Sequence, residues 1–132
     1  MKHHPTVFIA STPEESAWVS RFSDSLRAEG IEVWSELSAA ATGAEIRQSV
    51  QAGLKRSDVV VIIVSPHSLA SSSVFFEIGA ALAMGKMIIP VVARGTKLSE
   101  VPVSLSERKW VVRSDPAQTA REVASALLAT KA

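Results

Sequence analysis

The feature that most constrains the fold of this chain is a regular alternation between short β-branched runs and longer segments with helical periodicity. A strand, a helix and a further strand in succession predict two parallel strands joined by a right-handed crossover. Several such units in a row predict helices on both faces of one parallel sheet. We therefore expect a three-layer α/β/α domain with a five-stranded parallel sheet in the order 2-1-3-4-5, which is a flavodoxin-like architecture.

The third expected strand is the most informative, because its residues Val59–Val64 are all apolar. A run of this kind is typical of a strand buried on both faces, as at the centre of a parallel sheet. Pro90 lies inside the fourth run, and since proline has no backbone N–H to donate, we expect that strand to end close to it. The five expected strands cover residues 6–10, 31–34, 58–64, 87–92 and 109–112.

Helix start and stop signals lie between these runs. Residues 12–15 (TPEE) place Thr12 as a helix N-cap and Glu15 in the third helical position, which is a capping-box pattern. Gly30 is expected to end this helix. Residues 42–45 (TGAE) repeat the capping box before a second helix. Further helices are expected over residues 73–84 and 115–128, whereas residues 96–105 stay open between a short helix and a loop.

Composition narrows the classes of function. The chain has 132 residues, 47% of them apolar and 20% charged, so we expect one globular domain over residues 1–132. A formal net charge of +1 argues against nucleic acid as a partner, and the absence of cysteine excludes a disulfide scaffold and a thiol nucleophile. No apolar run is long enough to span a membrane, and we expect no signal peptide before the first strand. These observations predict a soluble, cytoplasmic protein without a membrane partner.

The expected topology also predicts where a ligand would bind. Ligands of open parallel sheets bind beyond the carboxyl ends of the strands, at the point where the strand order reverses. Here that point lies between the first and third strands. The loops after the first three strands meet there, together with the start of the helix expected over residues 73–84. These segments supply eight candidate substrate-binding residues: Ser11, Thr12, Trp34, Ser35, Ser65, His67, Phe75 and Phe76.

The residues present exclude several familiar occupants of such a site. A phosphate-accepting receiver domain needs acidic residues after the first and third strands, where this chain has Ser11 and Ser65. The turn after the first strand is not glycine-rich, so no flavin or dinucleotide cofactor is expected. His3 and His4 are adjacent and His67 stands alone, so we expect no metal site.

Glu77 is the candidate catalytic residue. With Ser73 as the helix cap, Glu77 occupies the fourth helical position and so is not part of a capping box. An acid near a helix N-terminus is also stabilised by the helix dipole, by roughly 0.3 to 1 kcal/mol, which is the structural alternative. However, Phe75, Phe76 and Ile78 surround it in sequence, and burial among them would raise its pKa or require a partner. Catalytic carboxylates are commonly arranged in this way.

Over residues 6–128 the sequence resembles a Toll/interleukin-1 receptor (TIR) domain. The specific part of the resemblance consists of residues 57–66 (SDVVVIIVSP), 76–81 (FEIGAA) and 88–91 (IIPV). Two weaker segments, residues 7–11 (VFIAS) and 30–34 (GIEVW), resemble the first and second strands of the family. Ser73 departs from the pattern, because catalytic bacterial members often carry tryptophan at that position.

Membership of this family implies a flavodoxin-like fold and one of two activities. Many bacterial and plant TIR domains cleave the nicotinamide–ribose bond of NAD⁺, and they use a glutamate at the position of Glu77. The products are nicotinamide and ADP-ribose or a cyclic isomer of it. Other TIR domains are non-catalytic adaptors that assemble through the loop after the second strand, here residues 39–43. The resemblance thus implies NAD⁺ as substrate with no cofactor, self-association, a fused or partner sensor domain, and a role such as bacterial antiphage defence.

The chemistry of this bond is compatible with the residues of the chain. Its cleavage passes through an oxocarbenium-like transition state, which a nearby carboxylate stabilises. Trp34, Phe75 or Phe76 would stack on a ligand ring, or would belong to the core instead. Ser11 and Ser65 would donate to ribose or phosphate oxygens, or would only cap a turn.

Three hypotheses about function therefore stand. The first is an NAD⁺ nucleosidase or cyclase whose activity requires self-association. The second is a non-catalytic TIR scaffold for protein–protein assembly. The third is an enzyme similar to nucleoside deoxyribosyltransferases, a related α/β fold in which a glutamate near the same helix start acts as a covalent nucleophile. Retention of Glu77 favours an enzyme, and residues 57–66 favour the first hypothesis over the third.

Overall fold

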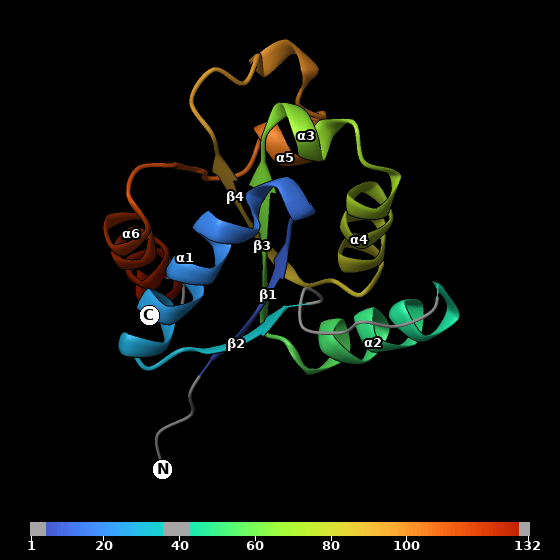
Figure 1. The fold of residues 1–132 in the computed structure, drawn as a ribbon, viewed down its shortest axis with the longest axis horizontal. Helices are drawn as coiled ribbons and strands as arrows, with labels where there is room; N and C mark the ends of the chain where they lie inside the picture. Colours follow the sequence, from blue (N-terminus) through green and yellow to red (C-terminus); the bar gives the residue numbers. More distant parts are fainter. Residues whose placement is uncertain (1–4, 36–42, 130–132) are drawn as a thin grey trace.

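The chain folds around one five-stranded parallel sheet (Figure 1). The structure, a computed structural model, describes residues 5–35 and 43–129, without the side chains of residues 35–49, 128 and 129. The strands pair in the order β2-β1-β3-β4-β5, all parallel, which confirms the predicted flavodoxin-like topology. The strands are β1 (Thr6–Ala10), β2 (Glu32–Ser35), β3 (Val59–Val64), β4 (Met87–Val92) and β5 (Val111–Val112).

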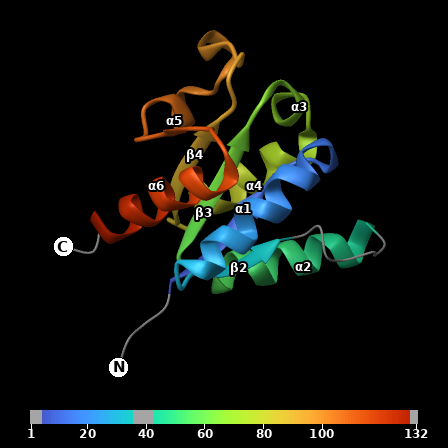
Figure 2. The same cartoon turned by 60° about the vertical axis from the view of Figure 1, so that its left-hand side comes forward.

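Helices cover both faces of the sheet, so the domain has three layers (Figure 2). One face is covered by α1 and α6, which lie side by side, and the other by α2, α4 and α5. The helical elements are η1 (Pro13–Glu15), α1 (Ser16–Ala28), α2 (Gly43–Arg56), α3 (Pro66–Leu69), α4 (Ser72–Ala83), η3 (Leu98–Glu100), α5 (Val103–Ser106) and α6 (Pro116–Ala129).

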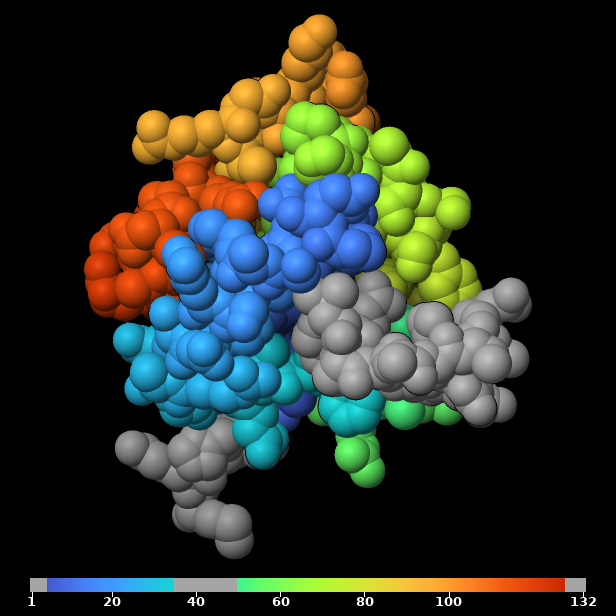
Figure 3. All heavy atoms as spheres, in the orientation of Figure 1, coloured from blue at the N-terminus to red at the C-terminus, as the bar shows by residue number. Residues whose placement is uncertain are grey.

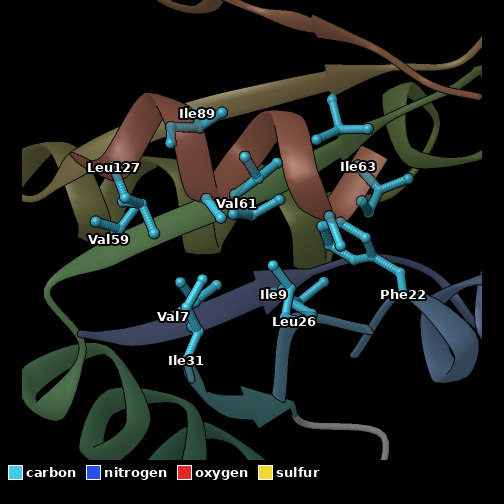
Figure 4. Packing of buried hydrophobic residues seen from close by; sticks show 14 of the residues in the cluster. Val7, Ile9, Phe22, Leu26, Ile31, Val59, Val61, Ile63, Ile89 and Leu127 are labelled. Carbon is cyan, nitrogen blue, oxygen red and sulfur yellow. The ribbon is translucent and has the colours of Figure 1, made fainter. Parts of the chain in front are cut away.

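The hydrophobic core is divided in two by the sheet. Side chains of a strand alternate between its two faces, so consecutive residues of β3 enter different clusters. Val61 packs with Phe22 and Leu127 under α1 and α6, as Figure 4 shows. Val60 packs instead with Leu54 and Ile78 under α2 and α4. Every residue of β3 is buried, as the apolar run predicted.

Pro90 lies inside β4, which has the predicted bounds of Met87–Val92, and does not itself end the strand. It pairs in register with Ile62, and β4 continues to Val92. Backbone groups of successive strand residues point to alternate sides, and the Val92 carbonyl accepts from β5. Position 90 points to that same side, but β5 pairs only with Val91 and Val92. The missing N–H of Pro90 therefore removes no hydrogen bond from the sheet.

The element boundaries differ from the prediction mainly at helix starts. Ser71, rather than Ser73, caps α4, because the Ser71 hydroxyl accepts from the Val74 N–H at 3.3 Å. The expected capping box at Thr12 does not form, since the Thr12 side chain makes no cap hydrogen bond. Thr42, the cap expected for α2, lies outside the described residues. The helix α3 was not predicted, and residues 96–105 contain the two short helices η3 and α5.

The expected strands are slightly too long at three starts. The second and third begin one residue later than predicted, and β5 contains only Val111 and Val112.

Within the described ranges, no helix combines the length and apolar character needed to cross a membrane.

Candidate functional site

The predicted switch point lies at the carboxyl ends of β1 and β3, which are neighbours in the sheet. Ser11 follows β1 and Ser65 follows β3, and both side chains are buried. The Ser11 hydroxyl has no hydrogen-bond partner among the described residues. Leaving a buried hydroxyl unpaired costs about 1 to 3 kcal/mol, so this group is available to a polar ligand.

Glu77 is the most deeply buried charged side chain in the described part of the chain, at 1% exposed. It lies on the core-facing stripe of α4, together with Val74, Ile78 and Ala81. This helix contacts β1, α2 and α3, so the stripe faces the sheet on the β1 side. The cap at Ser71 places Glu77 in the second helical turn rather than the first. A dipole role in the first turn therefore does not explain its position.

The two phenylalanines before Glu77 do not surround it. Phe75 is 41% exposed and Phe76 is 45% exposed, because neither lies on the core-facing stripe of α4. The expectation of burial among aromatic rings is therefore wrong, and the neighbours of Glu77 on its stripe are aliphatic. A role of the phenylalanines in substrate binding stays a prediction.

Trp34 is partly buried and packs on the same sheet face as Glu77. It lies beside Phe8 in the sheet, and its indole ring lies against Gly53 of α2 so closely that a Cβ there would overlap it. Its Nε1 is buried and has no hydrogen-bond partner among the described residues. Ser35, rather than Trp34, ends β2, and the Ser35 side chain lies outside the described residues.

Ser65 caps the short helix α3. Its hydroxyl accepts from the Ser68 N–H at 3.2 Å, and the Ser68 hydroxyl accepts from the Ser65 N–H at 2.8 Å. The structural role anticipated for Ser65 is therefore present. His67 is exposed on α3, close enough to Glu14 and Glu15 to help lower the pKa of both carboxyls.

A partly buried ion pair near these loops was missed by the sequence analysis. Arg113, directly after β5, donates from Nη1 to Glu15 Oε1 at 2.6 Å. The guanidinium also lies over the Trp18 ring, 4.3 Å from its centroid. Burial raises the pKa of Glu15, but hydrogen bonds from Arg113 and Ser65 and the charge of Arg113 outweigh it, so the pKa is below its usual value.

Two hollows of the described part lie elsewhere. One of about 450 Å³ borders β2 and has Trp34, Arg27 and Arg56 in its lining. Another of about 470 Å³ lies between the start of β4 and the C-terminal part of α6, with Met87, Lys109 and Ala126 in its lining. Neither includes Glu77. No group of three His, Asp or Glu side chains in residues 5–35 and 43–129 is placed to hold a metal ion.

The comparison with protein families shows which of the families with this fold the chain belongs to. The family model described as "TIR domain" matches residues 7–128, which is nearly the whole chain. The chain belongs to the TIR domain family. No curated protein matches this TIR domain in sequence.

Solved structures similar to this TIR domain include receptors and glycosidic enzymes. The TIR domain of the Toll-related receptor TRR-2 of Hydra magnipapillata aligns with a TM-score of 0.73 and 20% identity, over 95% of both chains. The CMP N-glycosidase BcmB of Clostridium botulinum gives 0.67 and 21%, over 89% of this chain and 96% of that one. A 2-desoxiribosyltransferase of Leishmania mexicana gives 0.58 and 21%, over 67% and 64%. At these identities the likeness shows the shared fold.

Proposed function

We propose that this TIR domain cleaves the bond between nicotinamide and ribose in NAD⁺, with Glu77 as the catalytic residue. The observation that carries the proposal is the burial of this carboxyl group, at 1% exposed, on the sheet-facing stripe of α4. A carboxylate is costly to place among aliphatic side chains, and such positions are common for groups that act on a substrate. The resemblance of residues 76–81 to TIR domains, whose catalytic members carry a glutamate at the position of Glu77, agrees with this role.

The proposed reaction needs only one carboxylate. As the C–N bond breaks, positive charge develops on the ribose, and Glu77 stabilises it electrostatically. The effect is large because little water reaches a group so deeply buried. Nicotinamide leaves as a neutral molecule, so no general acid is required. Capture of the ribose by water gives ADP-ribose, and capture by another part of the nucleotide gives a cyclic isomer.

The carboxyl edge of the sheet supplies candidates for holding the substrate. The buried, unpaired hydroxyl of Ser11 is suited to donate to a ribose or phosphate oxygen. The fold of this chain is shared with a CMP N-glycosidase, and that likeness supports chemistry at an N-glycosidic bond on this scaffold. Thr12, Ser35, Ser65 and His67 remain proposed contacts of the same site.

The test is nicotinamide release from NAD⁺ by concentrated protein, with Glu77→Gln beside the unchanged chain. Loss of a positioned catalytic group is expected to lower the rate by roughly 10² to 10⁴-fold. Glu122→Gln, an exposed substitution of the same kind on α6, is the matched control and should leave the rate unchanged. Release that persists in folded Glu77→Gln protein would contradict the proposal.

A scaffold without catalysis is the second candidate, and the outer face of α4 favours it. Phe75, Phe76 and Leu82 of α4 are exposed, as is Met84 at its C-terminal cap, and exposed apolar patches mark association sites. Silence toward NAD⁺ in protein shown to be associated would support this function. The third candidate is an enzyme similar to nucleoside deoxyribosyltransferases, and the likeness to a 2-desoxiribosyltransferase is compatible with it. Exchange of the base of a deoxynucleoside would reveal this activity.

We further propose that self-association activates the enzyme, because constant hydrolysis of NAD⁺ would harm its host. The loop predicted to mediate it, residues 39–43, lies largely outside the described residues. Such an enzyme would act in the cytoplasm, where NAD⁺ is available, under the control of a fused or partner sensor domain. Bacterial antiphage defence is the role we propose for it.

A further inference from the structure

Glu15 connects three loops at the carboxyl edge of the sheet. It lies in η1, in the loop that follows β1, and it bonds to Arg113 after β5 at 2.6 Å. The Ser65 side chain after β3 also lies near this carboxylate and helps to lower its pKa. Figure 3 shows the surface of η1, in blue, directly beneath that of α3, in green. We call Glu15, Ser65 and Arg113 the edge brace.

The arginine of the edge brace is itself held in place. Its guanidinium lies between the Glu15 carboxylate and the ring of Trp18, 4.3 Å from the ring centroid. The Trp18 Nε1 donates to the Ser114 carbonyl at 3.1 Å, and its ring stacks on Phe22 at 4.9 Å. A planar guanidinium makes both contacts at once, which an ammonium group does not.

A short turn over residues 12–15 links Glu15 to the candidate site. The Glu15 N–H donates to the Thr12 carbonyl at 3.0 Å, which closes a short turn. Pro13 lies within that turn, and its ring fixes one of the backbone torsions between the two residues. A displacement of Glu15 therefore moves Thr12, and with it the adjoining Ser11.

We propose that Glu15 is a positioning residue, which sets Ser11 and Thr12 for substrate through the edge brace. The inference rests on the proposed function, because Ser11 and Thr12 are contacts of that site. Glu15 does not touch the reacting bond in this proposal. Its loss is expected to weaken substrate binding, whereas loss of Glu77 affects the chemical step.

The first test measures the loop without any substrate. In Glu15→Gln, amide hydrogen exchange at positions 14 to 16, followed by NMR, is expected to be faster by about tenfold, the effect of losing one charge-assisted hydrogen bond. Amides of β3 should keep their rates. The matched control is Asp24→Asn, which removes the exposed ion pair of Asp24 with Arg27 on α1 and should change neither set. Unchanged exchange at positions 14 to 16 overturns the proposal.

The second test uses the proposed reaction. Glu15→Gln is expected to raise the KM for NAD⁺ by about tenfold with kcat within about twofold, whereas Glu77→Gln lowers kcat. Arg113→Lys keeps the charge and is expected to have a smaller effect, which provides a second variant if Glu15→Gln does not fold. A lowered kcat at unchanged KM overturns the positioning role. If the unchanged chain releases no nicotinamide, the proposed function fails, while the exchange experiment still decides whether Glu15 holds the loop.

Discussion

At the residue scale, one glycine decides how closely α2 approaches the sheet. The indole ring of Trp34 lies against Gly53 and fills the space that a Cβ atom at this position would occupy. The close approach brings α2 onto the same sheet face as α4 and Glu77. Gly79 offers a contrast on α4, because nothing lies within 4 Å of a Cβ placed there.

We expect opposite effects from alanine at these two glycines. Gly53→Ala should destabilise the fold by about 1 to 3 kcal/mol, since the methyl group forces the indole ring or the helix to move. Gly79→Ala should stabilise it by about 0.4 to 1 kcal/mol, because alanine restricts the unfolded chain and favours a helix. Urea denaturation of both variants measures the two changes. A stable Gly53→Ala protein would mean that Trp34 is free to turn aside.

The two buried glutamates show which parts of a site can be predicted from sequence. The position of Glu77 was visible because its neighbours along the helix are apolar and its place in the topology is near the switch point. Glu15 was assigned to a capping box, since residues 12–15 fit that local pattern. Its partner Arg113 lies 98 positions away, and no local pattern reveals that pairing. An arginine directly after the last strand was the available signal.

At the element scale, the start of α4 determines where Glu77 lies in its helix. Ser71→Ala should destabilise the fold by about 1 kcal/mol, because it removes the hydroxyl that accepts from the Val74 N–H. Ser73→Ala is the matched control, since Ser73 is an exposed residue inside the helix, and it should change stability by less than about 0.5 kcal/mol. Thermal unfolding compares the two variants. Equal losses would contradict the assignment of Ser71 as the cap.

The short helix η1 is expected to be the acid-sensitive element. The pKa of Glu15 is below its ordinary value of 4.5, so the folded state binds fewer protons than the unfolded state. The stability that this provides is complete above about pH 4.5 and is lost as the pH falls through the lowered value. Arg113, His67 and Glu14 are the charged groups that interact with it.

Glu15→Gln should therefore be less stable than the unchanged chain at neutral pH, and should lose less stability on acidification to about pH 3. Urea midpoints along a pH series measure both slopes. Parallel slopes would show that the Glu15 carboxylate titrates in the folded protein as it does in the unfolded one.

The presence of each strand was predicted more accurately than the residues at which the strand begins and ends. The five β-branched runs identified every strand of the described sheet, and the pattern is strongest in β3, which is buried along its whole length. The effect of Pro90 depends on how far β5 extends beside β4, which the residues around Pro90 do not encode. The same holds for β5 itself, where Trp110 looks like a strand residue but makes no pairing.

At the scale of the whole molecule, the described surface is divided between a sheet edge that resembles a ligand site and an apolar helix face. The first depends on the meeting of β1 and β3, and the second on α4. An enzyme activated by self-association needs both. The two features are therefore compatible with one mechanism rather than with competing functions.

We expect the rate per molecule to rise with protein concentration. Phe76→Ser should raise the concentration needed for half-maximal association by roughly tenfold, since it removes an apolar side chain from the outer face of α4. Val112→Ser, at an exposed apolar residue of β5, is the control and should leave that concentration unchanged. Sedimentation and nicotinamide release over the same concentrations test this. A constant rate per molecule would show that a single copy is fully active.

The contact of Glu15 with Arg113 also has a consequence for synthesis on the ribosome. At roughly 5 to 20 residues per second, the 98 positions between them correspond to a delay of roughly 5 to 20 seconds. During that interval the nascent chain carries the acid without its cation. Prematurely terminated translation products that end before β5 therefore lack the cation that holds Glu15 at the carboxyl edge of the sheet.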